Sequence, residues 1–254
     1  GLIIGGDVGM AGAARMAGEA CARVGAGLTT VATRPEHISA IVTARPELMA
    51  KGISETDTVN DLQALLNKAS VIVLGPGLGQ SNWSETLFKH VINTEVPMVV
   101  DADGLNLLAK LKDYHGLKKN NWILTPHPGE AARLLACTTA EIEKDRFAAV
   151  KQLQQKYDGV IILKGAGTLV CDQTQEIFVC DAGNPGMASG GMGDVLTGII
   201  TGLMAQHTPL ADAAQLAVIL HAKAADLAAD EFGERGLLAT DLFFYLRKLM
   251  NNQS

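Results

Sequence analysis

Short apolar runs alternate with longer segments of helical length along most of the chain. The apolar runs span three to five residues and end in glycine or polar residues, which is typical of buried parallel strands joined by crossover helices. The pattern predicts an α/β fold with a mostly parallel central sheet flanked by helices. We expect strands at 2–4, 28–32, 71–74, 98–100, 122–124 and 160–163, a hairpin at 169–171 and 177–179, and helices at 11–24, 130–135, 140–156, 195–206 and 210–231.

Unusual loops follow four of the predicted strands, each rich in glycine, proline or charged residues. In an open parallel sheet, ligands bind outside the carboxyl ends of the strands. Because these ends lie at one edge of the sheet, we expect the four loops to converge on one site. The loops are residues 75–79, 101–103, 125–130 and 164–168.

The composition narrows the classes of function. With 254 residues, 48% of them hydrophobic and 19% charged, the chain can bury the core of one large domain. No proline- or serine-rich linker and no internal repeat divides it, so we expect a single domain over residues 1–254. The net charge of -6, without a run of lysines or arginines, argues against binding to nucleic acid. No run of about 20 apolar residues occurs, so we expect no membrane association.

The cysteines and the start of the chain indicate the cellular compartment and whether the chain is part of a longer protein. Cys21, Cys137, Cys171 and Cys180 show neither zinc-site spacing nor a disulfide framework, so we expect a reducing cytoplasm. The apolar start is too short for a signal peptide and lacks a basic leader. Because the chain begins at Gly1 and enters a predicted strand at once, we expect it to be part of a longer protein.

The strongest chemical signal is the segment 183–194, which holds five glycines and leads into an apolar helix. Glycines allow successive backbone N–H groups to surround one point, and the first turn of a helix leaves further N–H groups unpaired. Phosphate oxygens are favoured at such a position. A carboxylate at Asp194 would be repelled by bound phosphate unless it accepts a proton or holds a metal ion. The segment predicts an anion site with a general base, although Asp194 alone also fits an N-capping residue.

Two common nucleotide motifs do not fit the glycine loops. Gly75, Gly77 and Gly79 lie two residues apart, unlike the G-x-G-x-x-G fingerprint. Pro76 also lacks an N–H group for a pyrophosphate. In the loop 164–168 the lysine precedes the glycines, whereas in a Walker A loop it follows them. The backbone of this loop and its threonine hydroxyl still suit a nucleotide phosphate or base.

Other polar residues at the predicted site have two interpretations each. His127 lies between two prolines, where its ring is suited to contact a substrate or transfer a proton, or is displayed on the surface. Glu130 is expected to cap or begin the following helix; alternatively, it contacts a water molecule bound to Mg²⁺. His221 is expected to be a packed residue. Asp101 and Asp103 follow a strand, and they either orient substrate or Mg²⁺ or stabilise the turn.

Ten segments in sequence order relate the chain to a known family: 3–7, 9–14, 25–28, 44–49, 75–79, 101–106, 125–130, 164–168, 183–194 and 240–242. With them, the chain resembles the ADP/ATP-dependent NAD(P)H-hydrate dehydratases. The resemblance implies a ribokinase-like three-layer sandwich. The chain is most similar to the C-terminal domain of the bacterial bifunctional NAD(P)H-hydrate repair enzymes, which carry an NAD(P)H-hydrate epimerase domain in front.

The resemblance implies a repair reaction: the S epimer of hydrated NADH or NADPH is dehydrated at the expense of ADP or ATP, with release of phosphate and AMP or ADP. It assigns Asp194 as the base that removes the hydroxyl proton while that oxygen attacks the terminal phosphoryl group. Mg²⁺ and backbone N–H groups would stabilise the developing charge, and the metal ligands stay open. The implied nucleotide contacts are Lys164, Gly165, Ala166, Gly167, Thr168 and Gly193; the hydrate contacts are Ala13, Gly79, His127 and Asp194; the anion hole is Gly190, Gly191, Met192 and Gly193.

Two other functions remain open at this point. A ribokinase-like kinase of a vitamin precursor would use the same anion hole and Asp194 but release a phosphorylated product. A nucleotide-binding regulator would not need Asp194. The segments 9–14 and 125–130 favour the dehydratase. The resemblance also implies a homotetramer, and it leaves open whether ADP or ATP is the donor and whether hydrated NADH or NADPH is preferred.

Overall fold

The centre of the fold is one mixed sheet. The computed structural model describes residues 1–56 and 58–251, and these form nine strands in the order β3-β2-β1-β4-β5-β6-β7-β8-β9. The strands β1 to β7 are parallel, and β8 and β9 form an antiparallel hairpin at one edge. Their bounds are β1 (Leu2–Ile4), β2 (Thr30–Thr33), β3 (Met49–Gly52), β4 (Ile72–Leu74), β5 (Met98–Val100), β6 (Trp122–Leu124), β7 (Val160–Leu163), β8 (Thr168–Cys171) and β9 (Ile177–Cys180).

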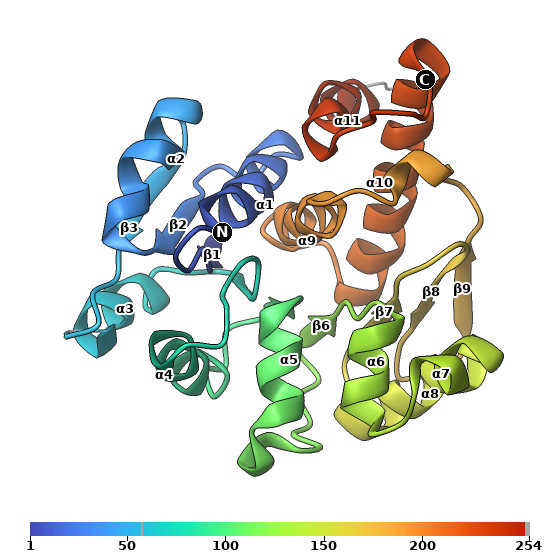
Figure 1. Cartoon of the computed structure of the whole chain (residues 1–254), viewed down its shortest axis with the longest axis horizontal. Helices are drawn as coiled ribbons and strands as arrows, with labels where there is room; N and C mark the ends of the chain where they lie inside the picture. The colour runs from blue at the N-terminus through green and yellow to red at the C-terminus, as the bar shows by residue number, and fades with distance from the viewer. Residues whose placement is uncertain (57, 252–254) are drawn as a thin grey trace.

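Helices cover both faces of the sheet, so the fold has three layers (Figure 1). Successive strand side chains point to opposite faces, and they enter two separate cores: Val73 and Val99 lie in one, Leu74 and Val100 in the other. The helices on the first face are α1 (Ala11–Arg23), α2 (Ile38–Ala44), α9 (Met192–Met204), α10 (Leu210–Phe232) and α11 (Leu242–Asn251). Those on the second are α3 (Thr58–Leu66), α4 (Asn82–Val91), α5 (Asp103–Lys110), α6 (Pro128–Leu135), α7 (Thr139–Lys144) and α8 (Arg146–Tyr157).

The mostly parallel sheet and its hairpin confirm the expected fold class, while several helix boundaries differ. The helix expected at 140–156 is divided into α7 and α8, because the Asp145 side chain accepts from the Ala148 N–H at 2.9 Å and caps a new helix. The helix expected at 195–206 begins earlier, at Met192. The strand β3 and the helices α2 to α5 were not predicted. No helix within the described ranges is both long and apolar enough to cross a membrane.

The strand order reverses at β1, which lies between β2 and β4. This reversal is the position at which open α/β sheets bind ligands. The loops beyond it pack backbone against backbone: a Cβ at Gly75 would lie 1.8 Å from the Asp101 carbonyl oxygen, and Gly75 has φ +141°. Only glycine satisfies both conditions. The predicted convergence of the strand-end loops is confirmed by this contact and by the side-chain contacts described next.

Candidate active site

A buried carboxylate joins three elements at the edge of the sheet. Asp101 directly follows β5 and is 1% exposed. Its Oδ1 accepts a hydrogen bond from the Lys164 Nζ at 2.7 Å, and its Oδ2 accepts one from the Thr197 hydroxyl at 2.8 Å. Lys164 follows β7, and Thr197 lies on α9. Asp101 therefore fixes the position of the lysine relative to α9.

Lys164 lies near a second buried carboxylate. Its Nζ is 3.8 Å from Glu130 Oε2, and Glu130 is 5% exposed. Burial alone would lower the pKa of Lys164, but Asp101 and Glu130 outweigh it and raise the pKa above its ordinary value. Burial raises the pKa of Glu130, and the charge of Lys164 opposes this rise. Lys164 is therefore a fixed cation suited to face a phosphate group.

The first turn of α9 lies against this ion pair. A Cβ at Gly193 would be 3.4 Å from the Lys164 Nζ and 3.7 Å from Asp101 Oδ2. The helix begins after Gly191, which has φ +91° and supplies no side chain to cap the first turn. A Cβ at Gly191 would also meet the Met16 side chain at 2.6 Å. A glycine N-cap leaves the first N–H groups of α9 open to an anion, next to a cation.

Asp194 lies in this first turn and is half-buried. Burial raises its pKa to about 7, the negative charges of Asp101 and Asp103 contribute to the rise, and Lys164 opposes it. A carboxyl group with this pKa exchanges its proton near neutral pH, as a general base requires. The N-cap of the helix is Gly191, so the interpretation of Asp194 as an N-capping residue is wrong.

The loop between β7 and β8 is held in place by an arginine that was not predicted to belong to the site. Arg146 Nη1 donates to the Ala166 carbonyl at 2.6 Å, and a Cβ at Gly165 would lie 2.7 Å from Arg146 Nη2. The Thr168 hydroxyl donates to the Gly165 carbonyl at 3.1 Å. These contacts give the 164–168 loop one defined shape, which suits a binding loop whose backbone must face a ligand.

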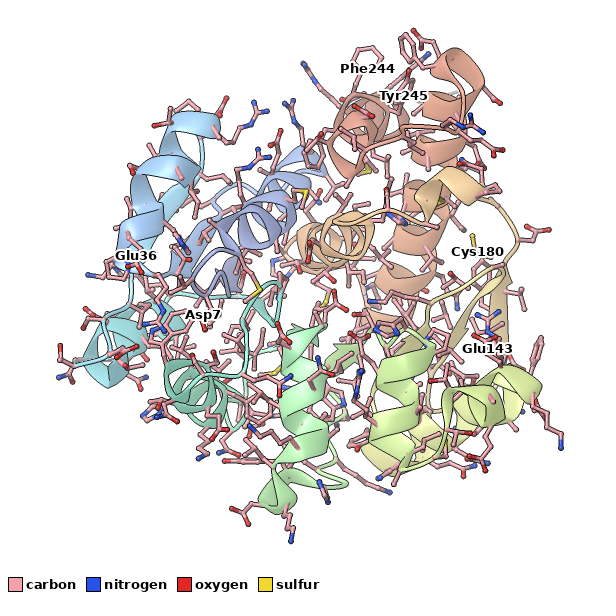
Figure 2. All side chains as sticks on the ribbon, viewed as in Figure 1. Asp7, Glu36, Glu143, Cys180, Phe244 and Tyr245 are labelled. Atoms are coloured by element: carbon pink, nitrogen blue, oxygen red, sulfur yellow. The ribbon has the colours of Figure 1, made fainter. Side chains whose placement is uncertain are left out.

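A second group of loops meets next to Asp103. The Gly79 N–H donates to Asp103 Oδ2 at 2.9 Å, and a Cβ at Gly79 would lie 2.8 Å from Asp7 Oδ2. A Cβ at Gly77 would lie 3.1 Å from the Ala13 Cβ. The loop after β4 is therefore in contact with the loop after β1 and with the first turn of α1. Figure 2 labels Asp7 where these loops meet.

His127 is linked to the same site through Glu130. The His127 N–H donates to Glu130 Oε2 at 2.8 Å, and Nδ1 accepts from the Gly129 N–H at 3.0 Å, which forms a capping box at the start of α6. The expected capping role of Glu130 is confirmed. Burial lowers the pKa of His127, and the charges of Lys164 and Arg133 lower it further. With Nδ1 as an acceptor, the ring proton of neutral His127 is assigned to Nε2, which lies 3.5 Å from Glu130 Oε1.

The sequence model of the NAD(P)H-hydrate dehydratase family matches residues 1–248. The chain belongs to this family. The bifunctional NAD(P)H-hydrate repair enzyme of Coxiella burnetii is 58% identical over 98% of this chain, which spans 50% of that protein. The ADP-dependent (S)-NAD(P)H-hydrate dehydratase of Neisseria meningitidis is 36% identical over 98% of this chain and 84% of its own length.

Solved structures of similar proteins agree with this family. The ADP/ATP-dependent NAD(P)H-hydrate dehydratase of Bacillus subtilis, co-crystallised with ATP and Mg²⁺, is 30% identical, has a TM-score of 0.82, and matches over 98% of this chain and 87% of its own. A ribokinase-like superfamily protein from Enterococcus faecalis has 31% identity and a TM-score of 0.86 over 98% of this chain and 85% of its own. The ribokinase-like sandwich is thereby confirmed.

Within this dehydratase fold, the residues named from the sequence form two neighbouring groups. Lys164, Gly193 and Asp194 lie together around Asp101, and His127 joins them through Glu130. Ala13 and Gly79 lie in the second group, connected to the first by Asp103, whose charge acts on Asp194. Gly190 has open space beside it, whereas Met192 is buried, so Met192 contributes backbone only. The ligands of these residues stay a prediction.

Two neighbours of the site residues were missed from the sequence, Thr197 and Arg146. Thr197 donates to Asp101, the partner of Lys164, and Arg146 holds the 164–168 loop. His221 is buried, which confirms its expected packing role. His221 is 7% exposed, and its buried Nε2 has no hydrogen-bond partner within the described residues. Burial, the largest cause, lowers its pKa to about 4. Only Thr197 had a visible signal: it lies one helical turn after Gly193 and hence on the same face of α9.

Proposed function

We propose that this chain catalyses the ADP- or ATP-dependent dehydration of the S epimer of hydrated NADH or NADPH, with release of phosphate and AMP or ADP. The observation that carries the proposal is Asp194, a carboxyl group with a pKa of about 7 beside a helix start that no side chain caps. The names of the Neisseria and Bacillus relatives support the substrate and the nucleotide. Family membership gives no support to the small-molecule kinase that the sequence left open.

The chemistry begins with proton transfer to Asp194. Its carboxylate takes the proton of the hydroxyl group at C6 of the hydrated ring, and the oxygen attacks the terminal phosphorus of the nucleotide. The bond from that phosphorus to AMP or ADP breaks. Phosphate is a better leaving group than hydroxide, so its departure from C6, with loss of a proton from C5, restores the ring double bond. General-base help of this kind contributes about 10²–10⁴-fold to the rate.

The negative charge that develops on the phosphoryl group is stabilised by hydrogen-bond donors and a cation whose positions are already fixed. Backbone N–H groups of 190–193 and the ammonium group of Lys164 are held in place before the ligand arrives, because Asp101 and Thr197 fix the lysine against α9. Fixed dipoles and charges need no rearrangement during the reaction, which makes them effective in stabilising a transition state. The loop 165–168 is the proposed contact for the rest of the nucleotide.

Mg²⁺ fits this site as an ion carried by the nucleotide phosphates. Within the described residues, no three carboxylate, histidine or thiolate side chains gather as a metal-ligand cluster, and both oxygens of Asp101 already accept hydrogen bonds. Mg²⁺ commonly takes one or two carboxylates together with phosphates and water. Both oxygens of Asp103 also accept hydrogen bonds, so the phosphates and water would supply most ligands of the ion, and the ion would neutralise phosphate charge.

The proposal is tested with purified protein, hydrated NADH, Mg²⁺ and either ADP or ATP. Recovery of the dihydronicotinamide absorbance together with phosphate release is expected, and the faster donor identifies the nucleotide. Asp194→Asn keeps the size of the side chain and removes the base, so turnover should fall by about 10²–10⁴-fold while nucleotide affinity is retained. Binding of nucleotide without recovery of NADH by the wild-type chain would favour the kinase instead.

We also propose a cytoplasmic homotetramer that is part of a longer protein with an epimerase domain. The Coxiella relative, which is bifunctional and of which this chain spans 50%, supports the longer protein. The tetramer and the epimerase domain rest on the family resemblance, and the cytoplasmic location rests on the cysteine pattern. Light scattering of the purified chain tests the tetramer, and a monomer would contradict it.

A further inference from the structure

A cavity of about 450 Å³ lies between α1, α11 and the turn that precedes β3. The described residues that line it include none of the candidate active site. Four of them are arginines: Arg15 and Arg23 on α1, Arg45 before β3, and Arg247 on α11. The chain has eight arginines and a net charge of -6, so half of its guanidinium groups gather at one place in an acidic protein.

One carboxylate is present to balance these four charges. Glu19 is the acidic residue among the described residues that line the cavity, and it is 1% exposed. It accepts from Arg15 Nη1 at 3.1 Å and from Arg23 Nη2 at 3.5 Å, and it also pairs with Arg45 Nη2. The cavity therefore carries an excess of three positive charges on its wall.

The arginines are partly shielded from water. The side chains of Arg15, Arg23 and Arg45 are 23%, 31% and 31% exposed, so their mutual repulsion is less screened than on an open surface. The Nε of Arg45 is buried and has no hydrogen-bond partner among the described residues. Guanidinium groups bind phosphate through paired N–H donors. An anion with several oxygens would relieve the repulsion and use donors that Glu19 leaves free.

The rim of the cavity adds an apolar surface. Phe244 projects from α11 and is 69% exposed (Figure 2). A large exposed aromatic ring beside arginines can pack on the organic part of a bound molecule. The volume lies in the range of small-molecule sites, roughly 300–1,000 Å³.

We propose that this cavity binds a small organic di- or polyphosphate, with the phosphate groups against Arg15, Arg23, Arg45 and Arg247 and the organic part against Phe244. The site is distinct from the candidate active site, and the proposal does not depend on the proposed dehydratase activity.

The first test is site-resolved protection of arginines. The wild-type chain is treated with phenylglyoxal with and without inorganic pyrophosphate, and modification is measured for each arginine by mass spectrometry. We expect pyrophosphate to protect Arg15, Arg45 and Arg247, while the exposed Arg235 serves as the unprotected control. Protection limited to Arg146, which belongs to the candidate active site, would overturn the proposal.

The second test compares variants. Arg247→Gln removes a cavity charge from the exposed face of α11, and Arg235→Gln removes one from the surface elsewhere. Loss of one charge-assisted contact should weaken pyrophosphate binding by about tenfold or more in Arg247→Gln, and binding by Arg235→Gln should match the wild type. Equal affinities in all three proteins would overturn the proposal.

A third outcome concerns a second copy of the chain. Light scattering could show that the wild type forms an assembly and that Arg247→Gln dissociates it. If the cavity arginines of that assembly also resist phenylglyoxal in the absence of pyrophosphate, an acidic surface of another copy occupies the cavity. The proposal is then wrong.

Discussion

Replacing Asp194 by asparagine should stabilise the folded protein at alkaline pH. The pKa of this carboxyl group is raised from 3.8 to about 7 on folding, chiefly by burial. Between these values the folded state holds a proton that the unfolded state has lost. The stability of the wild type must therefore fall as the pH rises from about 4 to about 7, and stay low above it. Asparagine carries no such penalty.

The size of the effect follows from the same two pKa values. One pKa unit corresponds to about 1.4 kcal/mol, so the full difference amounts to roughly 4 kcal/mol at pH 8. Asp194 is half-buried, and solvent screening reduces this to roughly 2–4 kcal/mol. At pH 5 less than half of the effect should be present. The gain in stability would accompany the loss of turnover, as expected where a functional group is held in an unfavourable environment.

Urea denaturation of the wild type and of Asp194→Asn at pH 5 and pH 8 measures this difference. Asp212→Asn is the matched control, because Asp212 is also an acidic residue in the first turn of a helix, but it is exposed. The gap between Asp194→Asn and the wild type should widen by about 1–3 kcal/mol between the two pH values. A gap that does not change with pH would refute the assigned protonation state and, with it, the argument for a general base.

Three further changes test the architecture of the site. Thr197→Val leaves one oxygen of the buried Asp101 without its donor at 2.8 Å, which should cost about 1–3 kcal/mol in urea denaturation, whereas Thr197→Ser should retain most of the stability. Gly193→Ala places a methyl group 3.4 Å from the Lys164 ammonium group and should weaken nucleotide binding measured by calorimetry. Gly27→Ala, which lies outside the candidate active site and has open space beside it, should bind as the wild type does. Arg146→Gln removes the support of the 164–168 loop and should raise the KM for nucleotide more than it lowers kcat; an unchanged KM would contradict the loop's proposed role.

The fold was predictable where the signal is local. Each central strand is a short apolar run followed by glycine or a polar residue, and this pattern depends only on neighbouring positions. The same holds for the glycine segment before α9 and for Glu130, which caps its helix from three residues away. The division of one predicted helix at Asp145 depended on a single capping contact, which an amphipathic pattern does not show.

The side-chain contacts within the site were not predictable, because the residues that form them are distant in sequence. Lys164 lies 63 residues from Asp101, and Thr197 lies 96 residues from it. Spacing carries no information at such separations, since only the order of strands in the sheet brings these residues together. Arg146 was missed for the same reason: its side chain reaches carbonyl groups 17 to 20 residues further on.

The bridge through Asp101 also sets when the protein can become active during synthesis. Asp101 emerges from the ribosome first, Lys164 follows, and Thr197 comes last, so the nascent chain must hide an unmatched buried carboxylate or keep it hydrated until α9 is made. Nucleotide capture should therefore appear abruptly, only once α9 has docked on the sheet. A ribosome-stalled chain that ends before α9 would contain all nine described strands and no functional phosphate site, which makes nucleotide binding a direct reporter of the docking of α9.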